Sequence, residues 1–106
     1  MTKPEMIASL AASITSTSKW RLNVAEKYPA DRRYERAARK LARLAEDTVN
    51  LSDTDWELLR PHFCSDGWET CVREVSRQVG FHRKMSLQFY IRTLLRQLSA
   101  TPATAG

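Results

Sequence analysis

The amino-acid sequence predicts an all-α protein, a compact bundle of four to six helices joined by short connections. The 106-residue chain has only three glycines and four prolines, which leaves little material for tight hairpins. It is rich in residues that favour helices, such as alanine, leucine and arginine. Apolar residues recur every three or four positions along most of the chain, as they do in amphipathic helices. We expect a single domain over residues 1–99 and a disordered tail over residues 100–106.

The first helix is expected over residues 4–28. The hydroxyl residues 15–18 weaken this prediction, because serine and threonine compete for backbone hydrogen bonds. One helix with a weak middle is preferred, and two shorter helices are the alternative. Pro29 ends the segment, because the residue before a proline is pushed out of the α region. The inward side at helical spacing consists of Met6, Ile7, Leu10, Ile14, Thr17, Trp20, Val24 and Tyr28.

Residues 31–49 predict a second helix that has two unlike faces and ends near Asn50. Asp31 is the expected N-cap. The apolar face consists of Tyr34, Ala37, Ala38, Leu41, Leu44, Ala45, Thr48 and Val49. The opposite, cationic face consists of Arg32, Arg33, Arg36, Arg39, Lys40 and Arg43.

A short third helix is expected after Leu51. Ser52 is placed to cap it, and Asp55 stands at the third helical position. Leu51 can pack on Trp56 as a hydrophobic staple. Pro61 follows soon afterwards and keeps this helix short.

Two further helices complete the predicted bundle. The fourth is expected from the N-cap Asp66 to a stop signal at Gly80. The last is expected from about Ser86 to Ser99. Cys71 falls on the apolar side of the fourth helix, so the two cysteines of the chain are expected to be thiols rather than a disulfide.

The cationic face of the second helix is the main candidate site. The chain has 17 basic and 12 acidic residues, a net charge of +5, which favours an anionic partner. Lysines and arginines spaced along one helix face can reach successive phosphates. The residues expected to do so are Arg32, Arg36, Arg39, Lys40 and Arg43. The alternative is a solvated face held by helical ion pairs, namely Glu35 with Arg39, and Glu46 and Asp47 with Arg43.

A second group of cations lies near the last helix. Arg83 and Lys84 precede its N-terminus, where an anion between them and the backbone N–H groups would be stabilised. The alternative there is an ordinary basic loop.

Residues 69–97 resemble a helix-turn-helix, with Arg92 and Arg96 exposed on the second helix. The connection between the two helices is longer than that motif requires, so an antiparallel hairpin is the alternative.

No catalytic, metal-binding or cofactor-binding signature is found in the sequence. His62, Cys64, Cys71 and His82 are of the right type for zinc, but they lack paired ligands at zinc-site spacing. The chain has no phosphate-binding loop and no dinucleotide fingerprint. No apolar run is long enough to cross a membrane. We therefore expect a cytoplasmic protein without enzymatic activity, metal or cofactor.

The expected function is that of a small accessory or regulatory protein that binds an anionic partner. DNA or RNA is the simplest such partner, and an acidic protein is another. The candidate residues are Arg32, Arg36, Arg39, Lys40, Arg43, Arg83, Lys84, Arg92 and Arg96. The rival function is a protein-interaction module or homo-oligomer, such as a homodimer, in which Trp20, Met85 and Phe89 mark the interface. For Phe89, packing of a central last helix is the plainer explanation.

Overall fold

The computed structural model of this protein describes residues 2–63 and 65–100. Within these residues it contains helices and no strand, which confirms the all-α class. The helices are α1 (Lys3–Lys27), α2 (Arg33–Asp47), α3 (Asp53–Leu59), α4 (Trp68–Val79) and α5 (Leu87–Ala100). Short 3-10 turns follow two of them, at Thr48–Asn50 and Arg60–His62.

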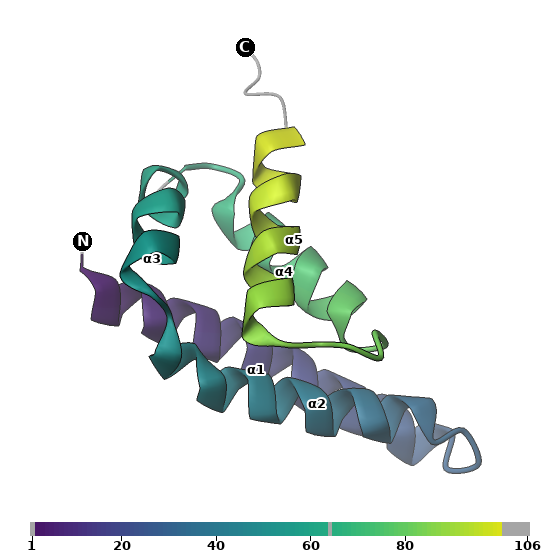
Figure 1. The fold of residues 1–106 in the computed structure, drawn as a ribbon. Coiled ribbons are helices and arrows are strands. Elements are labelled where there is room, and N and C mark those ends of the chain that lie inside the picture. The colour runs from purple at the N-terminus through teal and green to yellow at the C-terminus, as the bar shows by residue number, and fades with distance from the viewer. Residues whose placement is uncertain (1, 64, 101–106) are drawn as a thin grey trace.

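An antiparallel pair formed by α1 and α2 makes the base of the molecule (Figure 1). The other helices lie on one side of this pair, where α4 packs against α1 and α5 packs against α4. The core lies between the two layers and includes the fully buried Leu10, Ile14, Leu41, Val75 and Tyr90. The chain from residue 80 to residue 86, which we call the connecting loop, runs from α4 to α5 beside α2.

Helix α1 is continuous through its hydroxyl run, as preferred from the sequence. The Thr17 hydroxyl donates to the carbonyl of Ser13 at 3.1 Å within the helix. The buried Ser18 hydroxyl donates to the carbonyl of Ala38 on α2 at 2.7 Å. These hydroxyls therefore bond within α1 or to its neighbour instead of breaking the helix, and packing against α2 overrides their weak propensity.

Two predicted N-caps are wrong by one residue. The N-cap of α2 is Arg32 rather than Asp31. The Asp31 carboxylate still accepts the backbone N–H of Arg33, at 3.1 Å, from one position further out. The N-cap of α4 is Gly67 rather than Asp66, because the chain enters this helix through a backbone turn in which Trp68 donates to the carbonyl of Ser65.

Other boundary predictions are confirmed. The Ser52 hydroxyl accepts the N–H of Asp55 at 3.0 Å, and Gly80 is the C-cap of α4. The Ser86 hydroxyl accepts the N–H of Phe89 at 3.1 Å, so α5 begins where expected. Helix α5 includes residue 100, one residue into the predicted tail, and residues 101–106 lie outside the described residues.

A buried polar contact fixes α5 against α4. The hydroxyls of Ser76 and Tyr90 are 3.0 Å apart, and the Ser76 hydroxyl lies 2.7 Å from the carbonyl of Val72. Burial raises the pKa of Tyr90 well above its usual range, so the phenol stays neutral. This contact sets the separation of the two helices and so helps to place the connecting loop between them.

Candidate functional site

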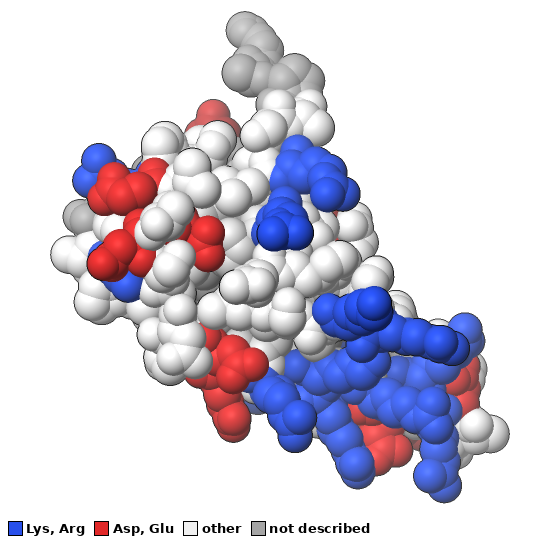
Figure 2. All heavy atoms as spheres, viewed as in Figure 1, with Lys and Arg blue, Asp and Glu red and all other residues white. Residues whose placement is uncertain are grey.

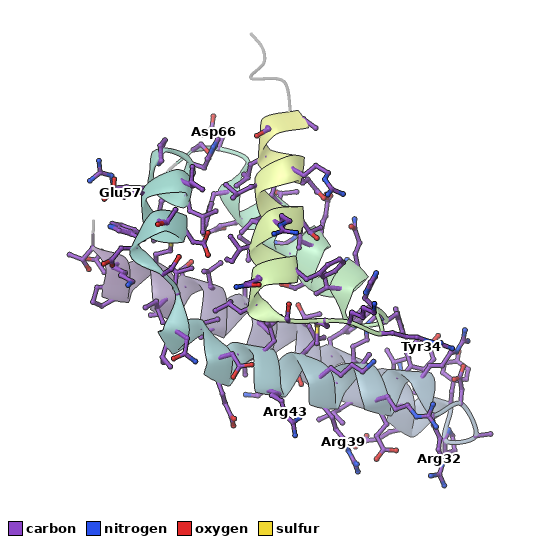
Figure 3. The ribbon with its side chains drawn as sticks, in the orientation of Figure 1. Arg32, Tyr34, Arg39, Arg43, Glu57 and Asp66 are labelled. Carbon is purple, nitrogen blue, oxygen red and sulfur yellow. The ribbon has the colours of Figure 1, made fainter. Side chains whose placement is uncertain are left out.

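The predicted cations of α2 lie on one outer side of the helix. Arg32, Arg36, Arg39 and Arg43 are exposed and Lys40 is half-buried. The side chains of Arg32, Arg39 and Arg43 point away from the body of the molecule, whereas Tyr34 points toward the connecting loop (Figure 3). Together these five basic residues form the surface that we call the basic face: Arg32, Arg36, Arg39, Lys40 and Arg43.

Few of these cations are neutralised by carboxylates. Arg39 pairs with Glu35 at 2.6 Å, as the solvated-face alternative predicted. The other expected pair, Arg43 with Glu46 or Asp47, is not formed. In the part of the chain that the structure describes, Arg32, Arg36 and Arg43 have no ion pair. The basic face therefore keeps most of its charge available to a ligand.

The connecting loop brings further cations to the same surface. The ammonium of Lys40 donates to the carbonyl of His82 at 3.3 Å, which ties the loop to α2. Arg83 and Lys84 follow and are exposed. A hollow of about 220 Å³ lies between loop and helix, and we call it the loop hollow. Its lining consists of Lys40, Arg43, Leu44, Asp47, Arg83, Met85 and Ser86.

The arginines of α5 form a separate group. Figure 2 shows a large cluster of basic atoms over α2 and the connecting loop, and a smaller one over α5, with uncharged atoms between them. Arg92 and Arg96 are the basic residues of α5, and both are exposed. Gln97, on the same helix, donates to Glu74 on α4 at 2.5 Å. The nine predicted residues therefore do not form one continuous site.

One cation that the sequence did not single out is buried. Arg21 of α1 is only 8% exposed. Its guanidinium donates to the carbonyl of Arg77 at 2.9 Å, in the last turn of α4, where the helix dipole favours a cation. Its Nε atom has no hydrogen-bond partner, and among the described residues no carboxylate pairs with it. Burial lowers the pKa of Arg21.

Aromatic rings surround this guanidinium in place of carboxylates. The central carbon of Arg21 lies 4.2 Å from the ring centroid of Phe81 and 4.5 Å from that of Trp20. Tyr34 is further away, at 6.0 Å. Arg77 lies over the Trp20 ring as well, at 4.8 Å. The cation is thus stabilised by ring faces and one carbonyl.

A larger groove lies between α1 and α4, and the sequence reasoning missed it. Its volume is about 640 Å³. Small residues of α1, Ser9, Ala12, Ser13 and Ser16, form one wall, and Trp20 stands at its end. The only signal in the sequence is the helical spacing of these small residues, which says nothing about the helix that lies opposite.

The predicted interface residues and the candidate zinc ligands do not lie together at one site. Phe89 and Met85 pack against the core, which confirms the plainer explanation of Phe89.

Neither hollow is lined by His62 or His82. Across residues 2–63 and 65–100, no cluster of His, Cys, Asp and Glu side chains suits a metal ion, and Cys64 lies outside these residues. In the same part of the chain, no helix has the length and apolarity needed to cross a membrane.

Comparison with protein families, with curated proteins and with solved structures gave no significant match. The functional argument therefore depends on the residues of this chain alone.

Proposed function

We propose that this protein binds nucleic acid through the basic face and the connecting loop. The observation that carries the proposal is the convergence of Lys40, Arg43 and Arg83 on the loop hollow from two segments far apart in the chain. Asp47 also lines the hollow, but it forms no ion pair with these cations within the described residues. Cations gathered in this way repel one another unless an anion lies between them.

A phosphate is the anion that suits this surface best. In the loop hollow it would lie beside Ser86, the residue that caps α5, where the positive end of the helix dipole favours negative charge. The exposed arginines of α2 extend the cationic surface over several helical turns, so that successive phosphates of a strand can be bound. Such contacts hold the backbone and read little sequence.

Charge-matched variants test the proposal. We expect Arg43→Ala/Arg83→Ala to weaken binding of a fluorescein-labelled duplex by about 60-fold at 0.1 M salt, since each lost phosphate contact removes about 0.9 log units there. Arg92→Ala/Arg96→Ala removes the same charge from the separate α5 group and should weaken binding far less. Fluorescence anisotropy gives both affinities. Equal losses in the two variants would show that net charge alone matters and would reject the proposed surface.

A second candidate function, association with another protein chain, is favoured by the groove between α1 and α4. The groove is large, and Trp20 at its end is 41% exposed. Light scattering with sedimentation distinguishes the candidates. A stable dimer that binds no nucleic acid would support the second function, and a monomer with salt-sensitive nucleic-acid binding would support the first.

A further inference from the structure

Aromatic rings form a row at the end of the molecule where α1 meets α2. The ring centroids of Tyr28 and Tyr34 are 6.3 Å apart, and those of Tyr34 and Phe81 are 6.0 Å apart. His82 is the next residue along the connecting loop, and its ring lies 4.2 Å from that of Phe89. Tyr28, Tyr34 and Phe81 thus form one group from the end of α1 across α2 to the loop, and His82 and Phe89 form a second group that reaches the first turn of α5. We call these five residues the aromatic row.

Several aromatic rings at this end of the molecule are largely exposed to solvent. Tyr28 is 59% exposed and Phe81 is 46% exposed. Trp20, which shares the Arg21 cation with Phe81, is also exposed. Aromatic rings that stay exposed to water do not gain the free energy of burial. A cluster of exposed rings therefore indicates a surface that is covered by a ligand.

The charge near these rings is positive. Arg21 lies among Trp20, Tyr34 and Phe81, and no carboxylate pairs with it within the described residues. The two carboxylates nearest in the chain to the start of α2 are already engaged, Asp31 by Arg33 and Glu35 by Arg39. A ligand at the aromatic row therefore meets ring faces next to cations.

The aromatic row borders the basic face. Lys40 of the basic face donates to the carbonyl of His82, and Arg83 and Lys84 follow His82 in the loop. On α2, Tyr34 lies two residues before Arg36 and points to the loop while Arg32 and Arg39 point outward (Figure 3). A flexible ligand can therefore contact both surfaces at once.

We infer that the aromatic row makes this protein a binder of single-stranded nucleic acid. Unpaired bases stack on the exposed rings of Tyr28 and Phe81, and the phosphates of the same strand lie along the basic face and the connecting loop. Base stacking on aromatic side chains is tolerant of sequence and acts together with a cationic groove along the backbone. This inference rests on the proposed function and specifies its ligand.

A single strand fits better than either a duplex or a protein. In a duplex the base faces are stacked inside the helix, so they cannot reach the aromatic row. The cores of protein interfaces are depleted in charged residues. Here the rings adjoin a buried arginine and several exposed cations, which suits a ligand that carries both flat bases and negative charge.

The test compares one variant on two ligands. We expect Tyr28→Ala/Phe81→Ala to weaken binding of a labelled single strand of about 20 nucleotides by about tenfold or more, since each stacked base contributes strongly. Binding of the duplex of the same sequence should stay within about twofold, because only phosphates are contacted there. Tyr28→Leu/Phe81→Leu keeps an apolar side chain at both positions, including the one at residue 81 beside Arg21, but lacks rings, and it should lose single-strand affinity in the same way.

A matched control removes exposed apolar side chains elsewhere. Val49 and Leu58 are 69% and 51% exposed and lie after α2 and on α3, so Val49→Ala/Leu58→Ala should leave both affinities unchanged. Circular dichroism and urea midpoints confirm that each variant is folded.

Three results would overturn the inference, and they differ in what else they reject. If the ring variants bind the single strand as the unaltered protein does, or if their affinities for single strand and duplex fall equally, the aromatic row has no base-stacking role. Duplex binding by the unaltered protein would still support the basic face in either case. If the unaltered protein binds neither ligand at low salt, the proposed function fails as well. If the ring variants abolish a dimer seen by light scattering and leave strand binding intact, the row is a protein interface.

Discussion

Helices α2 and α3 carry their charges in opposite order along the chain. Helix α3 has the acids Asp53 and Asp55 in its first turn, where the helix dipole favours negative charge. Helix α2 begins among arginines and ends at Glu46 and Asp47, and it has no basic residue in its last turn. The order of charges along α2 is therefore largely unfavourable for its helix dipole, although Glu35 is an acid in its first turn.

The two regions also differ in how their charges are paired. Near α3, Lys3 pairs with Asp53 at 2.8 Å and Arg60 pairs with Glu57 at 3.5 Å. The hydrogen bond from Lys3 lowers the pKa of Asp53. Glu57 and Asp66 lie far from Arg32 at the opposite end of the molecule, and acidic atoms gather over α3 while basic atoms gather over α2 (Figures 2 and 3).

The comparison separates charged residues that stabilise the fold from charged residues that have no partner inside the described part of the protein. The acids of α3 stabilise a helix start and form ion pairs, so folding alone explains them. In the basic face, Arg32 and Arg36 lie at the start of α2, where the helix dipole disfavours a cation. Within the described residues, Arg32, Arg36 and Arg43 have no carboxylate partner. A residue pattern that costs stability and is not compensated inside the molecule is typical of a functional surface.

The largest expected effect on stability comes from changing Arg21, the buried cation that has a structural role inside the molecule. Arg21→Ala should lower the free energy of unfolding by about 2 kcal/mol, because it removes a charged hydrogen bond to α4 and the contacts with two rings. Arg43→Ala, on the exposed face, should change it by less than about 0.5 kcal/mol. Urea unfolding followed by circular dichroism measures both.

Similar values for the two variants would contradict this part of the comparison. They would show that the buried and exposed cations do not differ in structural role.

A smaller effect is expected from correcting the charge order of α2. Arg32→Asp places an acid at the N-cap and should raise the free energy of unfolding by about 0.5 kcal/mol. The same change should weaken nucleic-acid binding by about tenfold at 0.1 M salt, because one phosphate contact is lost. Stability from urea unfolding and affinity from anisotropy should therefore move in opposite directions.

The matched control reverses the charge at the start of α3. Asp53→Arg should lower stability, since it removes the Lys3 pair and opposes the dipole, and it should not weaken binding. If Arg32→Asp destabilises the protein, or if its binding is unchanged, the trade-off at the start of α2 is absent.

Much of the fold is predictable from local patterns. Ser52 marks the start of α3 because its hydroxyl accepts a backbone N–H. Gly80 ends α4 with ordinary helical backbone angles, and it packs so closely on α2 that an added Cβ would lie 3.2 Å from Leu41. The shifts at Asp31 and Asp66 arise because backbone turns set the first helical residue. The continuity of α1 depends on Ser18 bonding to α2, a contact that no local pattern contains.

The site is predictable only in part, for the same reason. The periodicity of α2 identifies the outward position of Arg32, Arg39 and Arg43. The approach of Arg83 to Lys40, and the separation of the α5 arginines from both, follow from the path of the connecting loop. The aromatic row joins residues from α1 to α5, so its existence requires the tertiary structure.

The salt dependence of duplex binding by the unaltered protein tests the central claim most directly. If Arg32, Arg36, Lys40, Arg43, Arg83 and Lys84 each contact one phosphate, the log of the binding constant should fall against the log of salt concentration with a slope of about −5. Anisotropy titrations between about 50 and 200 mM salt cover the range in which that slope changes the affinity by orders of magnitude. A slope near zero, or no binding at the lowest salt concentration, would contradict a nucleic-acid-binding role for the basic face.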